Sequence, residues 1–355
     1  MADGPEIIFD DIGSYPLPAG MSRDKLPKGD PYLELVKDAL VQKIEAGVER
    51  PTYPQFRDMI RMFMEPIEDP ARSESPYLVR MESARILELE ALEALGKKIE
   101  REGDGEGREK GERLQARVCV TGPVELYLAR FGATEYADIL ENLAQSVARF
   151  IDMALKARYF EVAVASIDEP SLGISPNVIF TGDQISEALE IAARPCAKID
   201  CEVHLHSPLM AELCSSVPGI NVIGVESAGN PDYLKLVDRD VLAENDAFIR
   251  AGIARTDINA LVARLNDRLE TNLWRDPDRL EREVFAIETV ELMERRLAEA
   301  CRLFGDRVRY AGPDCGLGSW PSQKMAARCL SSSAKAISSF RSRQDRRRNG
   351  AGSAF

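Results

Sequence analysis

The stretch Glu161-Val-Ala-Val-Ala-Ser-Ile-Asp-Glu-Pro170 joins a short apolar run to two carboxylates and a proline. A β-branched, apolar run of about four to eight residues that ends in a turn signal is typical of a buried strand. Similar runs recur along the chain, with long helical patterns between them. We predict strands over residues 6–12, 46–52, 116–122, 161–167, 201–206, 221–225, 248–253 and 307–311.

Helical patterns cover residues 32–47, 136–156, 184–193 and 281–304. The alternation of strands and helices indicates parallel strands joined by crossover helices, so we predict the α/β class and a (β/α)8 TIM barrel. A doubly wound open sheet is the structural alternative. It is less favoured because no Gly-x-Gly-x-x-Gly turn follows the first strand. We assign residues 1–340 to this single barrel domain.

The composition is that of a soluble globular chain, with 355 residues, 45% of them hydrophobic, and a mean hydropathy of −0.24. No apolar run reaches the roughly 18 residues that span a bilayer, and the acidic N-terminus does not resemble a secretory signal. We therefore expect a cytoplasmic protein with no membrane partner. The seven scattered cysteines do not have the spacing of a disulfide framework.

The net charge of −13 argues against a nucleic-acid partner, because phosphate binding requires clustered Lys and Arg. Basic residues do gather at the C-terminus, where residues 341–355 lack apolar periodicity. We predict a disordered tail there. The charged, glycine-rich segment 100–111 is predicted to be an exposed connection between elements.

Polar and thiol side chains follow the predicted strands at the points where the strands end. In a barrel, all carboxyl ends of the strands open onto one face, where the active sites of this fold are built. Residues far apart in the sequence should therefore meet at that face. They are Ser14, Thr121, Asp168, His204, His206, Glu226, Asp257 and Cys315.

The only two histidines of the chain, His204 and His206, stand two residues apart on one predicted strand. Side chains at this spacing project from the same face, with Cα atoms about 6.5 to 7 Å apart, so both imidazoles can bind one metal ion. Glu226 offers an oxygen ligand one strand along, and Cys315 offers a thiolate at the rim. Nitrogen, oxygen and sulfur donors together favour tetrahedral zinc over magnesium or calcium. The alternative is a pair of hydrogen-bonded histidines that only pack.

Asp168 and Glu169 are adjacent carboxylates at a strand end. Neighbouring residues on a strand point to opposite faces, so only one of the two can face the barrel mouth. The other is left to pair with a helix or with the backbone at the strand end.

Six short motifs occur in the order in which a known family has them. They are Asp11-Ile-Gly-Ser-Tyr-Pro16, Val120-Thr-Gly-Pro123, Ile167-Asp-Glu-Pro-Ser-Leu172, Val203-His-Leu-His206, Val225-Glu-Ser227 and Gly312-Pro-Asp-Cys-Gly-Leu317. Over about residues 7 to 335 the chain resembles the catalytic domain of cobalamin-independent methionine synthase. In particular, it is similar to short, single-barrel archaeal and bacterial relatives that lack the N-terminal folate-binding half. The resemblance implies a zinc-dependent methyl transfer to a thiol.

The resemblance also implies roles for single residues. His204, Glu226 and Cys315 match zinc ligands of the family, whereas His206 stands where the family usually has a cysteine. Glu226 is the ligand that would loosen to make room for the incoming sulfur, which gives it a catalytic role. A neutral ligand at position 206 makes the zinc centre more positive, so it should acidify a bound thiol more strongly and leave the thiolate less nucleophilic.

A second set of residues matches the family's amino-acid site. Ile12, Gly13 and Ser14 correspond to the segment that holds the thiol substrate, and Asp168 corresponds to the carboxylate that holds its amino group. Asp168 is therefore the second residue to which we assign a catalytic role. Gln55 aligns with a position that is Glu in the long enzymes and Gln in some short ones.

Two further departures from the family bear on the substrates. The long enzymes carry a histidine that gives a proton to the folate leaving group, but the matching segment here is Thr256-Asp-Ile-Asn259. A methyl donor whose leaving group needs no proton, such as a methylated corrinoid protein, is therefore preferred over methyl-tetrahydrofolate. Tyr53-Pro54 replaces the usual Asp-Gly of the second strand end, which changes the expected hold on the amino acid.

The sequence thus predicts a zinc methyltransferase that acts on a small thiol, with homocysteine as the leading candidate and a corrinoid carrier protein as the partner. One alternative is a relative that alkylates another thiol, such as coenzyme M. Another is a barrel that only binds a ligand or a corrinoid protein.

Overall fold

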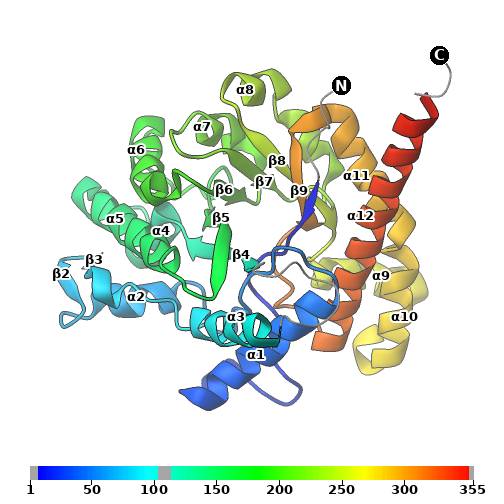
Figure 1. Cartoon of the computed structure of the whole chain (residues 1–355), viewed down its shortest axis with the longest axis horizontal. Coiled ribbons are helices and arrows are strands. Elements are labelled where there is room, and N and C mark those ends of the chain that lie inside the picture. The colour runs from blue at the N-terminus through cyan, green and yellow to red at the C-terminus, as the bar shows by residue number, and fades with distance from the viewer. Residues whose placement is uncertain (1–6, 103–112, 352–355) are drawn as a thin grey trace.

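A curled, all-parallel sheet of seven strands forms the centre of the computed structural model, which describes residues 7–102 and 113–351 (Figure 1). The strand order is β1-β9-β8-β7-β6-β5-β4, so neighbours in space are mostly neighbours in sequence. This confirms the predicted α/β class with a parallel sheet. The strands are β1 (Ile8–Phe9), β4 (Leu114–Thr121), β5 (Phe160–Asp168), β6 (Asp200–Leu205), β7 (Val222–Val225), β8 (Phe248–Ala254) and β9 (Val308–Pro313).

The predicted strand over residues 46–52 does not form a continuous ladder. Three isolated parallel bridges, Asp10 with Arg50, Ser14 with Gln55, and Thr52 with Arg117, link this part of the chain to its neighbours on either side. The segment contains Pro51, and Pro54 follows shortly after its end; proline has no N–H to donate to a ladder. The sheet therefore curls toward closure between β1 and β4, but the described residues do not form the eighth strand of the predicted barrel.

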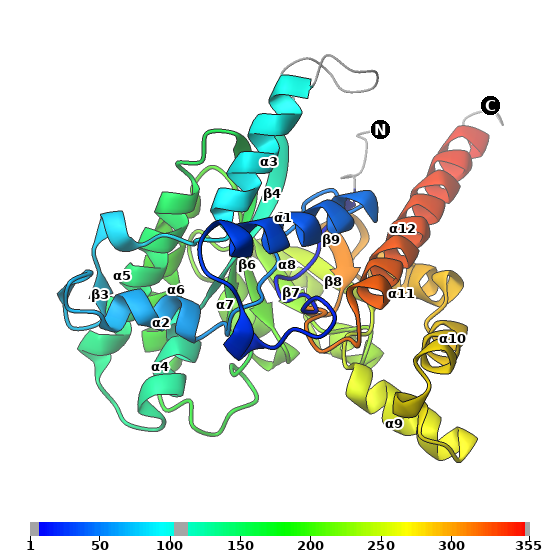
Figure 2. The ribbon, with the colours of Figure 1, turned by 90° about the horizontal axis from the view of Figure 1, so that it is seen from below.

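Helices lie around the outside of the curled sheet, as the two views in Figures 1 and 2 show. The predicted helix over 281–304 is two helices, because the chain turns at Glu288 and Thr289 caps the second one by accepting a hydrogen bond from the N–H of Leu292 (3.2 Å). The helices are α1 (Asp30–Glu45), α2 (Arg61–Glu68), α3 (Leu89–Glu102), α4 (Pro123–Phe131), α5 (Ala137–Ala154), α6 (Gly182–Ala193), α7 (Ala211–Ser215), α8 (Arg239–Glu244), α9 (Ile258–Leu269), α10 (Pro277–Ile287), α11 (Val290–Phe304) and α12 (Gln323–Ala351).

A short antiparallel hairpin, β2 (Ser73–Ser75) with β3 (Leu78–Val79), lies apart from the main sheet and was not predicted. Of the predicted exposed connection over 100–111, residues 103–111 lie outside the described residues, and the part before them belongs to the end of α3. None of the helices within the described ranges is long and apolar enough to cross a membrane.

The last helix corrects the prediction of a disordered tail over residues 341–355. α12 continues to Ala351, and residues 352–355 lie outside the described part. Arg341 donates from Nε to the carbonyl of Ile7 (3.0 Å) and pairs through Nη1 with Glu49 (2.7 Å), while Arg343 pairs with Glu294. These acidic partners hold Arg341 and Arg343 in place, and the chain is helical as far as Ala351, so the prediction of a disordered tail is wrong for residues 341–351.

The interior of the curled sheet contains a cluster of buried charges instead of only apolar side chains. Asp10, Arg117, Glu202 and Arg250 are each 0% exposed. Arg117 Nη1 contacts Asp10 Oδ2 (2.7 Å) and Glu202 Oε2 (2.6 Å), and Arg250 Nε contacts Asp10 Oδ1 (2.8 Å). We call these four residues the buried ion network. Each charge in it has an opposite charge within hydrogen-bonding distance, which buried ions require.

Replacing Arg117 by methionine should strongly destabilise the protein. The variant would leave the carboxylate of Glu202 without its cation and Asp10 with one cation fewer, and breaking a buried pair costs about 3–5 kcal/mol. Urea denaturation followed by circular dichroism measures the change in the free energy of unfolding. The matched control is Arg130→Met, which removes the exposed partner of Glu68 and should change that free energy little. Equal losses in the two variants would contradict a structural role for the buried ion network.

Candidate metal centre

Four side chains from the ends of three strands meet at the carboxyl edge of the sheet. His204 lies in β6, His206 follows that strand, Glu226 follows β7 and Cys315 follows β9. One ligand atom from each of the four residues can be chosen so that all lie within 4.8 Å of one another. We call these four residues the N/O/S cluster. The sequence singled out the same four residues, and the fold brings them together.

His206 is the central residue of the N/O/S cluster. Its Nε2 lies 3.3 Å from Glu226 Oε1 and 3.5 Å from Cys315 Sγ. The rings of His204 and His206 have centroids 5.6 Å apart and are nearly perpendicular, at 77°. The side chains of His206 and Glu226 are 35% and 29% exposed, whereas that of His204 is 2% exposed. The cluster is therefore closed at His204 and open to solvent at His206 and Glu226.

The surroundings of the N/O/S cluster favour neutral forms of its groups. Burial lowers the pKa of His204 well below its usual value, with a further lowering from His206 and Arg250, and it also lowers the pKa of His206. Burial raises the pKa of Glu226 to about 7 and the pKa of Cys315 well above its ordinary value. Neutral imidazoles are the form that binds metals, and a bound cation would reverse the effect on the carboxyl and thiol groups.

His204 provides an observation that fits a bound metal ion. Its Nδ1 and Nε2 are both buried, and neither has a hydrogen-bond partner within the described residues. Buried polar atoms without a partner are rare and costly. Two imidazoles, a carboxylate and a thiol form a donor set that suits tetrahedral zinc. The residues present therefore fit a zinc ion.

The backbone around Glu226 and Cys315 is held by a neighbouring carboxylate. Asp314 accepts hydrogen bonds from the N–H groups of Ala228 and Gly229 (2.7 Å each), which ties the loop after β7 to the end of β9. Gly252 leaves room for this contact, because a Cβ there would lie 1.8 Å from Asp314 Oδ1. Glu226 and Cys315 are thereby fixed relative to each other.

The segment predicted to hold the substrate lies beside the loop that carries Cys315. Ser14 accepts a hydrogen bond from Leu317 N through its carbonyl (2.8 Å) and one from Gly318 N through its Oγ (3.3 Å). Gln55 N donates to Gly13 O (2.9 Å), and a Cβ on Gly13 would lie 2.4 Å from the Gln55 side chain.

Ile12, in the same segment, is a buried core residue. A cavity of about 300 Å³ lies next to this segment, lined in part by Tyr15, Phe56 and Gly318.

Asp168 and Glu169 point to opposite sides, as the alternation along a strand requires. Asp168 pairs in register with His204, and its Oδ1 accepts a hydrogen bond from Ser166 Oγ (2.6 Å). Burial raises the pKa of Asp168 to about 7, although the Ser166 hydrogen bond and Arg117 oppose the rise.

Glu169 instead accepts from the N–H groups of Val124 and Glu125 (2.8 Å each) and so caps the N-terminus of α4. Asp168 is therefore the one of the two that remains near the N/O/S cluster.

Sequence reasoning missed the charged residues beneath the N/O/S cluster. Arg117, Glu202 and Arg250 each stand between two small or apolar residues of a buried strand, which is the signal that could have found them. A charge in a buried strand requires a partner, and only the curled sheet shows that these partners are one another.

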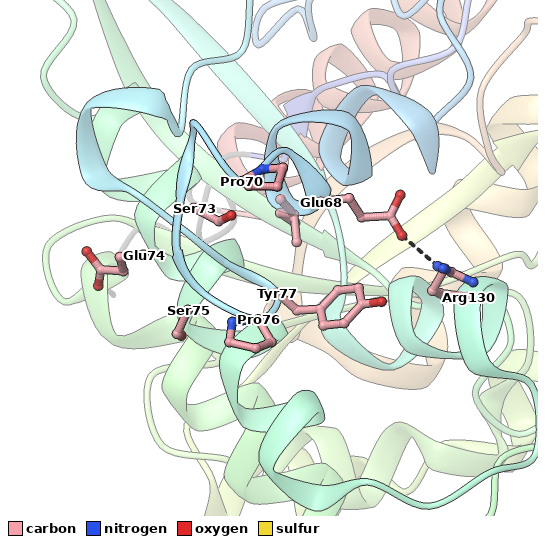
Figure 3. A pocket seen from close by; sticks show the side chains of 9 residues that line it. Glu68, Pro70, Ser73, Glu74, Ser75, Pro76, Tyr77 and Arg130 are labelled. Carbon is pink, nitrogen blue, oxygen red and sulfur yellow. Dashed lines mark hydrogen bonds and ion pairs between the residues drawn. The ribbon is translucent and has the colours of Figure 1, made fainter.

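A separate cavity of about 600 Å³ lies between α2, the β2–β3 hairpin and α4 (Figure 3). Its charged lining residues already have partners, since Glu68 pairs with Arg130 (2.6 Å) and Glu74 with Arg149 (2.6 Å). No residue of the N/O/S cluster lines this cavity. It therefore adds nothing to the chemistry of the candidate centre.

The fold and the N/O/S cluster together define an α/β chain with a donor set that suits zinc at the carboxyl ends of its parallel strands. No family model matches the chain, and no curated protein matches it. Solved structures do match its fold. A B12-independent methionine synthase from Shewanella, in complex with selenomethionine, has a TM-score of 0.64 and 13% identity, covering 95% of this chain and 98% of that one.

Two further structures show how widely this fold is shared. A Listeria monocytogenes protein, described as a candidate vitamin B12-independent methionine synthase, has a TM-score of 0.57 and 14% identity, with 96% and 99% covered. GH5_18 from Streptomyces cattleya, in complex with GlcNAc, has a TM-score of 0.51 and 11% identity, with 95% and 81% covered. At these identities the likeness extends to the fold alone, and the function has to be argued from the site.

Replacing Asp168 by asparagine should flatten the pH dependence of stability. The pKa of Asp168 is about 7 in the folded chain against 3.8 for an unperturbed aspartate, so its contribution is present below about pH 4 and is lost as the pH rises through 7. One proton corresponds to a slope of at most about 1.4 kcal/mol per pH unit. Urea denaturation of metal-free protein measures the slope. A series from about pH 4.5 to about pH 8 covers most of the window in which it is expected.

The exposed Asp267→Asn is the matched control for this prediction and should keep the wild-type profile. If Asp168→Asn showed that same profile, the carboxyl group of Asp168 would not be the source of the pH dependence.

Proposed function

We propose that the chain is a zinc-dependent methyltransferase that transfers a methyl group from a methyl-corrinoid, or a similar donor, to a thiol. Homocysteine is the proposed acceptor and methionine the product. The observation that carries the proposal is the N/O/S cluster, with a buried histidine that lacks any hydrogen-bond partner among the described residues. The fold shared with a B12-independent methionine synthase in complex with selenomethionine supports the choice of acceptor.

His204, His206, Glu226 and Cys315 would hold the zinc ion. When bound, zinc would stabilise the thiolate form of the substrate, because a coordinated thiol loses its proton at neutral pH. Glu226 and His206 lie on the open side of the N/O/S cluster, so a substrate sulfur would approach from there. Glu226 is the ligand that would give way to it.

The amino acid itself would be held by the residues next to the N/O/S cluster. Asp168 would accept hydrogen bonds from the substrate ammonium group, and its carboxylate is fixed for this by Ser166. Ile12, Gly13, Ser14 and Gln55 would hold the rest of the amino acid. Ser14 is tied to the loop that carries Cys315, so substrate and ligand share one rigid support.

The transfer balances without a further reactant. The thiolate sulfur attacks the methyl carbon, the new S–C bond forms, and the bond between the methyl group and its donor breaks. The donor leaves with the bonding electron pair. A corrinoid accepts that pair without needing a proton.

The lack of a third histidine supports the corrinoid as the methyl donor. The chain has two histidines, both in the N/O/S cluster, and Asp257 in the segment 256–259 is paired with Arg255 (2.6 Å). The methyl group would reach the site on a corrinoid carrier protein.

Replacing Cys315 by serine should abolish both zinc binding and methyl transfer, because the hydroxyl is a much weaker zinc ligand than a thiolate. The assay measures methyl transfer from methylcobalamin to a panel of thiols that includes homocysteine and coenzyme M, alongside zinc content by mass spectrometry. Cys301→Ser is the matched control, since Cys301 is also half-buried but lies outside the N/O/S cluster. Wild-type protein that contained no stoichiometric zinc would refute the proposed function.

Replacing His206 by cysteine should keep the zinc ion and change the rate or the preferred thiol. The substitution exchanges a neutral donor for an anionic one, which lowers the positive charge felt by a bound thiol. X-ray absorption at the zinc edge should show one sulfur ligand in wild type and two in the variant, with one more in each when the true thiol is added. Loss of metal from the variant would show that position 206 does not tolerate a simple exchange of ligand.

A further inference from the structure

Two buried polar atoms face each other beneath the N/O/S cluster. Glu202 Oε1 and His204 Nδ1 are 3.8 Å apart, and neither has a hydrogen-bond partner among the described residues. Glu202 is 0% and His204 is 2% exposed. The two residues are two positions apart on β6, so their side chains project from the same face of the strand. A carboxylate oxygen, which accepts, and an imidazole nitrogen, which can donate, lie without partners in one enclosed space, and this indicates an interaction between them.

Arg117 fixes the orientation of the Glu202 carboxylate. Its Nη1 lies 2.6 Å from Glu202 Oε2 and also binds Asp10, so Oε2 is occupied and Oε1 is left for another donor. Across the parts of the chain that the structure describes, Glu202 is the only carboxylate within 4.0 Å of a nitrogen of His204. Asp168, the register partner of His204, already receives the hydroxyl of Ser166 on its Oδ1.

Gly224 on the neighbouring strand leaves the space that this contact needs. Gly224 pairs in register with His204, and a Cβ there would lie 2.2 Å from Glu202 Oε1 and 3.3 Å from His204 Nδ1. Any larger residue would push the carboxylate away from the imidazole. The absence of a side chain at position 224 therefore serves the approach of Glu202 to His204.

We propose that Glu202 is a positioning residue that accepts the Nδ1–H of His204 and so leaves Nε2 as the nitrogen with a free lone pair. A neutral imidazole has one protonated nitrogen, and the hydrogen bond made by that nitrogen decides which tautomer is present. Nδ1 faces Glu202, so Nε2 is the atom left for the N/O/S cluster. The role of Glu202 in metal binding rests on the proposed zinc site, whereas its contact with His204 does not.

The tautomer can be measured directly, because the chain has only two histidines. Long-range ¹H–¹⁵N correlation spectra of the full-length protein, labelled with ¹⁵N-histidine and free of metal, should show a proton on Nδ1 of His204. His206→Gln assigns the signals. A wild-type His204 that carries its proton on Nε2 would overturn the proposal without the need for any Glu202 variant.

Two substitutions separate positioning from a merely structural role. Glu202→Leu removes the acceptor while Arg117 keeps Asp10, and it should give a mixture of tautomers and weaken zinc binding about 10- to 100-fold. Glu202→Gln keeps an acceptor oxygen and should restore most of both. Zinc affinity is measured by competition with a chromophoric chelator. An unchanged tautomer and unchanged affinity in Glu202→Leu would refute the assignment.

Addition of zinc to the labelled wild-type protein distinguishes this inference from the proposed function. A shift of the His204 Nε2 signal is the expected result. If zinc shifted no histidine signal, the proposed zinc site and the proposed methyltransferase function would be refuted. The tautomer of the metal-free protein would still test the contact between Glu202 and His204.

Discussion

The contact of Arg117 with both Asp10 and Glu202 is the interaction on which the candidate centre depends. It joins β4, the chain just after β1, and β6 inside the curled sheet, and Arg250 adds β8 through Asp10. Charges enclosed at 0% exposure interact strongly, but each one requires its partner in a defined place. The buried ion network therefore fixes the relative positions of strands whose carboxyl ends carry the polar residues. An apolar core of the same volume would pack without prescribing these positions.

A second buried ion pair, Lys43 with Asp11, helps to hold the segment around residue 52, where prolines prevent a regular strand. Lys43 Nζ contacts Asp11 Oδ2 (2.6 Å) and donates to Thr52 O (2.9 Å), while Thr52 N donates to Asp11 Oδ1 (2.9 Å). Side chains thus add to the few backbone hydrogen bonds of the segment around residue 52, such as Arg50 N to Phe9 O (3.0 Å) and Arg117 N to Pro51 O (3.2 Å). This explains how Gln55 reaches Gly13 although no eighth strand is formed within the described residues. The interior charges and the segment 12–14 are parts of one connected framework.

How much the sequence predicts depends on whether a feature follows from a local pattern or from a general rule of the fold. Strand β5 (Phe160–Asp168) was expected over 161–167, because a strand buried on both faces is a continuous apolar run. The N/O/S cluster was also predictable, since parallel strand ends must converge. The buried ion network was not, because a lone Arg117 or Glu202 shows no partner in the sequence. The basic end of α12 was misjudged for the same reason: Glu49 and Glu294, which hold it, are distant in sequence.

The fold alone does not assign the chemistry, since a sheet of this kind also occurs in a structure that binds GlcNAc. What is specific to this chain is the set of residues at the strand ends and the layer beneath them. One carboxylate and one thiolate, from Glu226 and Cys315, would formally balance the charge of a zinc ion held together with two neutral imidazoles. Such a centre attracts an additional thiolate more strongly than one with two thiolates, because it starts from a less negative charge. The proposed hydrogen bond from Nδ1–H of His204 to Glu202 would counteract this effect, because a carboxylate acceptor makes the imidazole a better donor. The layer beneath the cluster would therefore set part of the electronic character of the proposed centre.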